Sequence, residues 1–173
     1  MEKTLTDILS HLNYDVEITL KKIAALEPGM RIINKYATQN MIEQAEQGSY
    51  YQFTANILIL GDRLFEVAIG LSYFFSKCSN ANVLAVVTNY QEAMAAAKEH
   101  RVDYLIIAGY QKNNYNYHII HQLRERANPP HIVMWALLDQ CIFYECRKHK
   151  IYDSFDREKP LGEFIHFLEK LNG

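Results

Sequence analysis

The feature that most constrains the fold is the alternation of two kinds of segment after residue 54. Short apolar runs of strand length are each followed by a longer amphipathic stretch with helical period. The runs lack alternating polar residues, which is typical of strands buried on both faces, and such strands need helices above and below a parallel sheet. The expected strands are 57–60, 83–87, 104–107, 132–138 and 151–155, and the expected helices are 64–77, 90–100, 117–126, 140–149 and 161–171.

Five β/α units in about 120 residues suit one doubly wound domain. We therefore predict an α/β, flavodoxin-like fold with a five-stranded parallel sheet in strand order 2-1-3-4-5. The chain has 173 residues, of which 49% are hydrophobic, enough for this domain and a short appendage. The α/β domain is expected at 55–173 and the appendage at 1–54.

The segment 1–54 has helical periodicity and predicts about three helices before the first strand. Asp15 is expected to cap the second helix, and Gly48 to end the third. The apolar face of the second helix would consist of Val16, Leu20, Ile23 and Ala24. Because three short amphipathic helices are marginally stable alone, we expect this segment to pack on the α/β domain or across a dimer.

The charges argue against a nucleic-acid-binding protein. The formal net charge of the chain is -2, so there is no general electrostatic attraction for a phosphate backbone. Residues 1–54 contain 7 acidic and 5 basic residues and thus carry the whole net charge. This acidic segment offers no basic recognition helix, and no nucleic-acid partner is expected.

Cysteine usage and the length of the apolar runs indicate a soluble protein of a reducing compartment. Cys78, Cys141 and Cys146 are odd in number and lack CxxC spacing, so neither a disulfide framework nor a structural zinc site is expected. His118 and His121 have no further ligands at metal-binding spacing. The first residues show no signal-peptide pattern, and the apolar runs are far shorter than the ~18 residues of a membrane span. We expect a cytoplasmic protein with no metal, cofactor or membrane contact.

Four segments of the α/β part resemble, in order and spacing, the receiver domain of bacterial response regulators. They are Gly61-Asp62 after the first strand, Asn89–Ile107 over the second helix and third strand, Pro129–Met134 at the start of the fourth strand, and Lys159-Pro160 after the fifth. The resemblance covers roughly residues 55–171. It implies a receiver-like version of the flavodoxin-like fold.

The resemblance also implies a phosphorylation pocket, whose positions carry unsuitable side chains here. A working receiver has two carboxylates after strand one that help to hold Mg²⁺, a phospho-accepting Asp after strand three, a Ser or Thr after strand four and a Lys after strand five. The corresponding positions are Gly61 and Asp62, Ala108, Trp135 or Ala136, and Lys159 or Arg157. Alanine cannot accept a phosphoryl group, and one carboxylate makes a poor Mg²⁺ site. We therefore expect a degenerate receiver, a pseudo-receiver, in which Trp135 fills the empty pocket.

Two surfaces are candidates for binding. The loop after strand three, at the edge where open α/β sheets bind ligands, contains Tyr110, Asn113, Asn114, Tyr115 and Tyr117. This loop would contact a partner or a small polar ligand, or else be a polar turn whose tyrosines fold back on the helices. The face made by helix four, strand five and helix five, which receiver-like proteins use for docking, would present Phe143, Tyr144, Tyr152 and Phe155. Some of these residues must belong to the core, and the exposed remainder would make a protein-binding patch.

Two functions of different classes follow. The first is a non-enzymatic signalling module, a pseudo-receiver that acts through contact with an unidentified protein partner. For such a module, the N-terminal helices and the helix 4–strand 5–helix 5 face are the candidate surfaces for a homodimer. The alternative is a flavodoxin-like small-molecule sensor or enzyme that uses the loop 109–117, Asp62 and Lys159 at the carboxyl edge of the sheet.

Overall fold

A computed structural model describes residues 8–10, 12, 15–26 and 38–172 of the chain. Its centre is one five-stranded sheet in which every pair of neighbouring strands is parallel. The strands are β1 (Gln52–Leu60), β2 (Ser79–Val87), β3 (Tyr104–Ala108), β4 (His131–Ala136) and β5 (Asp153–Asp156), in the spatial order β2-β1-β3-β4-β5. The predicted doubly wound, flavodoxin-like architecture and its strand order are confirmed.

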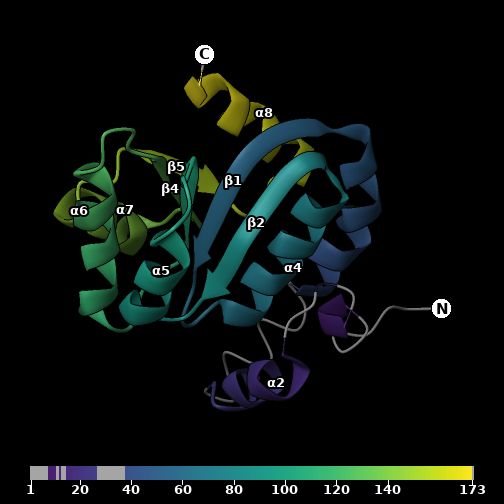
Figure 1. Cartoon of the computed structure of the whole chain (residues 1–173), viewed down its shortest axis with the longest axis horizontal. Helices are drawn as coiled ribbons and strands as arrows, with labels where there is room; N and C mark the ends of the chain where they lie inside the picture. Colours follow the sequence, from purple (N-terminus) through teal and green to yellow (C-terminus); the bar gives the residue numbers. More distant parts are fainter. Residues whose placement is uncertain (1–7, 11, 13–14, 27–37, 173) are drawn as a thin grey trace.

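Helices cover both faces of the sheet (Figure 1). The helices of this part are α4 (Phe65–Lys77), α5 (Tyr90–Ala97), α6 (His118–Arg124), α7 (Gln140–Lys148) and α8 (Leu161–Asn172). One hydrophobic cluster joins the sheet to α4 and α8, and a second joins the other face to α5, α6 and α7. Successive residues of β1 alternate between them, with Ile57 and Ile59 in the first cluster and Leu58 and Leu60 in the second. A strand whose side chains pack into a core on each face must be apolar at every position, which explains the unbroken apolar run 57–60.

The first two strands begin earlier than the apolar runs predict. β1 begins at Gln52 and alternates exposed and buried residues up to Ala55, and its first residue pairs with Ser79 of β2. These first halves extend beyond β3, which pairs with β1 only from Ile57 onward. Their side chains are therefore less enclosed, and polar residues occupy positions that a fully buried strand would fill with apolar ones.

Before β1, the described residues are mainly helical, as predicted. In α2 (Val16–Ala24), the Asp15 carboxylate caps the helix by accepting a hydrogen bond from the Ile18 N–H at 3.0 Å. The expected apolar face is wrong in part, because Leu20 and Ala24 are exposed whereas Thr19 and Ile23 are buried. Helix α2 lies at the lower end of the domain (Figure 1), and these two buried residues make a narrower stripe than that of a core helix.

The segment directly before the sheet is packed against α4. Residues 38–45 are helical and continue into a 3₁₀ turn, η1 (Glu46–Tyr50). A Cβ atom at Gly48 would lie 2.7 Å from the Phe74 carbonyl oxygen, so glycine is needed for this close approach. Of the expected first helix, residues 8–10 are helical and residue 12 lies in a turn, and the start of the expected third helix lies outside the described residues.

Within the part of the chain that the structure describes, no helix is long and apolar enough to cross a membrane.

Candidate functional site

The two positions that would carry the key carboxylates of a receiver pack against each other. Gly61 follows β1, and its N–H donates a hydrogen bond to the Val87 carbonyl at 2.9 Å. A Cβ atom on Gly61 would lie 3.2 Å from the Ala108 Cβ and 3.5 Å from the Ala68 Cβ. Even a methyl group at position 61 would thus be crowded. The contact between Gly61 and Ala108 leaves no space between them for a carboxylate or a phosphoryl group.

Trp135 lies next to Ala108 and is completely buried. The two residues pair in the β3–β4 ladder and belong to the same hydrophobic cluster. The indole stacks on Phe164 of α8, with ring centroids 6.3 Å apart and an interplanar angle of 25°. Its Nε1 has no hydrogen-bond partner among the described residues. The end of strand four therefore has a large aromatic side chain in place of a hydroxyl group. This side chain packs in the core between the sheet and α8.

Asp62, the remaining carboxylate, holds the loop that follows β3. It accepts hydrogen bonds from the backbone N–H of Arg63 and of Lys112, the latter at 2.7 Å. Longer contacts reach it from the Asn113 N–H at 3.4 Å and the Asn116 Nδ2 at 3.5 Å. This is the arrangement of a structural acceptor, and it leaves Asp62 with few lone pairs for a cation. The pKa of Asp62 is nevertheless raised, because burial outweighs these hydrogen bonds.

The raised pKa of Asp62 predicts an unusual pH dependence. Between its ordinary value of 3.8 and its value in the folded protein, the folded state binds more protons than the unfolded state. The free energy of unfolding contributed by this group should therefore fall as pH rises through that window. We expect the stability difference between the wild type and Asp62→Asn, followed by urea unfolding, to decline with pH and then level off. A difference that grows with pH would contradict the dominance of burial.

Two buried amides, which the sequence did not single out, hold the loop in place. Asn116 is 1% exposed, donates to the Thr88 carbonyl at 3.2 Å and accepts from the Tyr90 N–H at 3.2 Å. It thereby joins the loop after β3 to the loop after β2. Gln111 is fully buried and donates through its side chain to the Gly109 carbonyl at 3.0 Å. The carboxyl edge is thus closed by the protein's own polar groups.

The aromatic residues of this loop divide into two groups. Tyr117 is 3% exposed, stacks on His149 at a centroid distance of 3.7 Å and accepts a hydrogen bond from the Gln111 N–H. Its inclusion among the ligand-facing residues is therefore wrong, because its ring belongs to the core, where burial raises the pKa of its hydroxyl. Tyr110 and Tyr115 are 38% and 47% exposed. Asn113 and Asn114 are also exposed.

The two candidates for the family lysine differ in environment. Lys159 is exposed, and its ammonium lies 5.7 Å from the centroid of the Phe155 ring. Arg157 is half-buried directly after β5, with its N–H bonded to the Ala136 carbonyl at 3.0 Å. Its Nε has no hydrogen-bond partner among the described residues, and burial lowers the pKa of its guanidinium.

An open groove of about 560 Å³ lies at the same edge of the sheet, beside the closed pocket. It runs between Arg63 and Tyr110 on one side and the first turns of α7 on the other, where Cys141 presents an exposed thiol. This groove leaves room for a small molecule at the carboxyl edge.

The predicted docking face is exposed at three of its four positions. Phe143, Tyr144 and Tyr152 are 45%, 57% and 80% exposed. Phe155 is wrong as a member of this face, because it is 7% exposed and packs on Phe164 and Phe167. Phe143 and Tyr152 line a shallow groove of about 790 Å³, whereas Tyr144 lines the groove that contains Tyr110. We call Phe143, Tyr144 and Tyr152 the aromatic patch.

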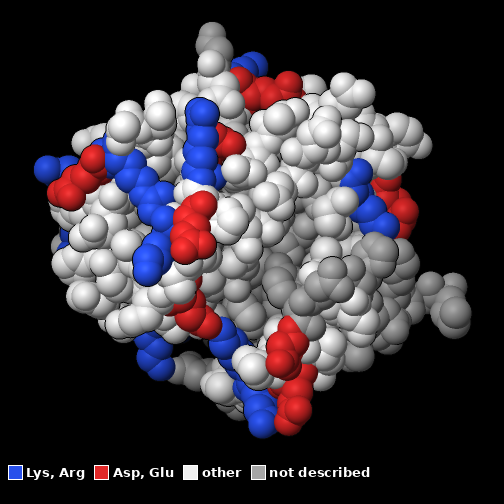
Figure 2. All heavy atoms as spheres, in the orientation of Figure 1, with Lys and Arg blue, Asp and Glu red and all other residues white. Residues whose placement is uncertain are grey.

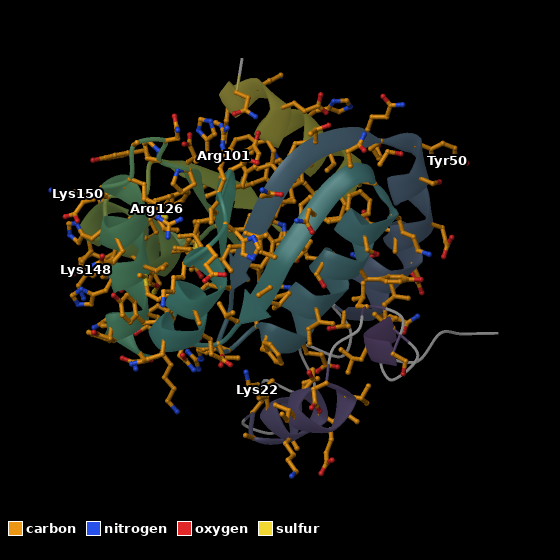
Figure 3. The ribbon with its side chains drawn as sticks, in the orientation of Figure 1. Lys22, Tyr50, Arg101, Arg126, Lys148 and Lys150 are labelled. Carbon is orange, nitrogen blue, oxygen red and sulfur yellow. The ribbon has the colours of Figure 1, made fainter. Side chains whose placement is uncertain are left out.

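Basic groups lie near the aromatic patch. Arg147 lines the groove together with Phe143 and Tyr152. Lys148, the last residue of α7, and Lys150 lie on one side of the molecule (Figure 3). The Arg124 guanidinium lies 5.5 Å from the centroid of the Tyr152 ring. An exposed aromatic set with cations beside it is a common composition for a protein-binding surface.

No cluster of three or more His, Cys, Asp or Glu residues that could hold a metal ion occurs among the described residues. No protein-family model matches this chain, and no curated protein is significantly similar to it in sequence.

Proposed function

We propose that the protein is a non-enzymatic signalling module, a pseudo-receiver of the cytoplasm that acts through contact with another protein. The observation that carries the proposal is the contact between Gly61 and Ala108. In the resemblance to receivers, these positions are the first acidic residue and the phospho-acceptor. Here they have no functional group and no space for one, while the sheet and helices around them are intact.

The aromatic patch supports the second half of the proposal. Exposed aromatic side chains lose little conformational entropy on binding and bury a large area, and they are enriched at protein interfaces. Tyr152, which is 80% exposed, makes little contribution to the fold of the free protein. The partner expected here is therefore a protein with an apolar surface, and the basic residues around the patch favour an acidic rim on it.

Treatment with a small phosphodonor and Mg²⁺, followed by intact-mass measurement, tests the proposal. We expect no stoichiometric phosphoryl adduct, because Ala108 has no nucleophilic atom and Asp62 is engaged by the loop. Asp62→Asn should behave in the same way as the wild type. A stoichiometric adduct on the wild type would contradict the proposal, and its loss in Asp62→Asn would identify the acceptor.

A small-molecule sensor remains the second candidate, because the groove between Tyr110 and α7 is open at the edge where such folds bind ligands. Native mass spectrometry of the purified protein distinguishes the two. A bound small molecule that is lost in Tyr110→Ala, and retained in the matched variant Tyr115→Ala, would favour the sensor. A ligand-free spectrum favours the pseudo-receiver.

A further inference from the structure

The sheet has two edges, and the two are built differently. At one edge, β5 has only four residues, two of which are Asp153 and Asp156. Short length and charge are the usual means by which proteins prevent an edge strand from pairing with another chain. At the other edge, β2 has nine residues, with no charged residue and no proline among them. The protection present on β5 is absent from β2.

The outer side of β2 carries backbone groups that its own sheet does not pair. In the described ranges, β1 is the sole strand that pairs with β2. Figure 1 shows β2 as the front strand, with its outer side turned away from β1. A row of N–H and C=O groups at such an edge is a template for another extended strand.

Among the residues that the structure describes, the surroundings of β2 leave room for that strand. A groove of about 640 Å³ follows the strand along residues 81–87 and continues between α2 and α4. Val83, Leu84 and Ala85 are only partly buried, although helices cover both faces of the sheet. Continuing the sheet would remove their apolar surface from water.

The charges near the groove are paired with each other. Lys22 of α2 points toward the domain, where it forms an ion pair with Glu92 of α5 beside the end of β2 (Figure 3). This pairing lowers the pKa of Glu92 despite its partial burial. Figure 2 shows mainly uncharged surface over β1 and β2, with the charged groups to either side.

We propose that β2 pairs antiparallel with β2 of a second copy of this chain, so that one sheet continues across a two-fold axis. A two-fold interface places the same strand on both sides, so that strand must be compatible with itself. β2 meets this condition because none of its side chains is charged. In β5, self-pairing would bring Asp153 and Asp156 close to their own copies, and like charges across a ladder are destabilising.

One irregularity of β2 limits this arrangement. Val83 pairs with Ile57 and Ala85 with Leu58, so Leu84 is an extra residue that forms a bulge. A bulge leaves its extra residue unpaired, so the ladder between the two copies would be interrupted at Leu84. The inference does not depend on the proposed function, because a phosphoryl adduct would overturn the function and leave the dimer untouched.

Sedimentation velocity over a range of protein concentrations, combined with amide hydrogen exchange, tests the proposal. We expect a dimer in which β2 amides become protected as the dimer forms. Asn82→Lys adds a charge at an exposed position of β2, and like charges across the two-fold axis should raise the dissociation constant about tenfold or more. Ser154→Lys, on the β5 edge, is the matched control and should leave the dimer intact.

A charge exchange makes the test specific. Asn82→Asp alone should weaken the dimer in the same way, and an equimolar mixture of Asn82→Lys and Asn82→Asp should form a heterodimer. Circular dichroism will establish that each variant is folded. The proposal is overturned by a wild type that stays monomeric, whether or not its β2 amides are protected. It is also overturned by a dimer that Asn82→Lys leaves unchanged, or by one that Ser154→Lys disrupts instead.

Discussion

Trp135→Ala should lower the free energy of unfolding by about 3–5 kcal/mol, the usual cost of removing a large aromatic side chain from a core. Trp135 is fully buried and packs against Phe164, so its removal leaves a cavity between β4 and α8 that the rigid sheet cannot fill. In a chain of this length the melting temperature should fall by about 10 °C. Urea unfolding followed by far-ultraviolet circular dichroism measures the effect.

Trp135→Phe serves as the control for this experiment. Phenylalanine retains the stacking on Phe164 and removes the indole N–H, which has no partner among the described residues. We expect a loss of only about 1–2 kcal/mol, because the smaller ring leaves a smaller cavity. Equal losses for the two variants would mean that the N–H, rather than the packing, contributes the stability.

The second large effect is expected for Asn116→Ala, at about 2–3 kcal/mol of unfolding free energy. Asn116 joins the loop after β3 to Thr88 and Tyr90, and its removal leaves buried polar groups without partners. Hydrogen exchange should also increase in the loop 109–117. Asn114, two residues earlier in the same loop, is exposed, and Asn114→Ala should cost less than about 0.5 kcal/mol. Similar losses for the two would show that Asn116 does not hold the loop.

The fold could be predicted from the sequence because buried parallel strands leave a simple pattern. Runs such as Ile57–Leu60 and Tyr104–Ile107 are apolar at every position, since both faces of the strand contact a core. The first halves of β1 and β2 were not predicted, because they lie beyond β3 and mix polar with apolar residues. The apolar runs therefore showed which segments form strands, but they did not show how long β1 and β2 are.

The candidate site was predictable in position and less so in detail. The resemblance left Trp135 and Ala136 open as the position after strand four, and in the structure Trp135 is the residue that pairs with Ala108. The roles of Gln111 and Asn116 were hidden, because a buried amide and a surface amide look the same in a sequence. For the same reason the sequence did not tell which aromatic residues of the two candidate surfaces, such as Tyr117 and Phe155, turn into the core. The direction in which an aromatic ring at an element boundary turns depends on packing partners such as His149 and Phe164, which are distant in the sequence.

The burial of Trp135 also makes the protein convenient to observe. It is the one tryptophan in the chain, so the intrinsic fluorescence excited at long wavelength comes from a single known place, the contact between β4 and α8. In the folded protein this indole should emit at short wavelengths, as it does in an apolar solvent. Binding at the aromatic patch or along β2 should leave that emission unchanged, whereas opening of the core should shift it to the red. One spectrum can thus separate surface association from loss of structure.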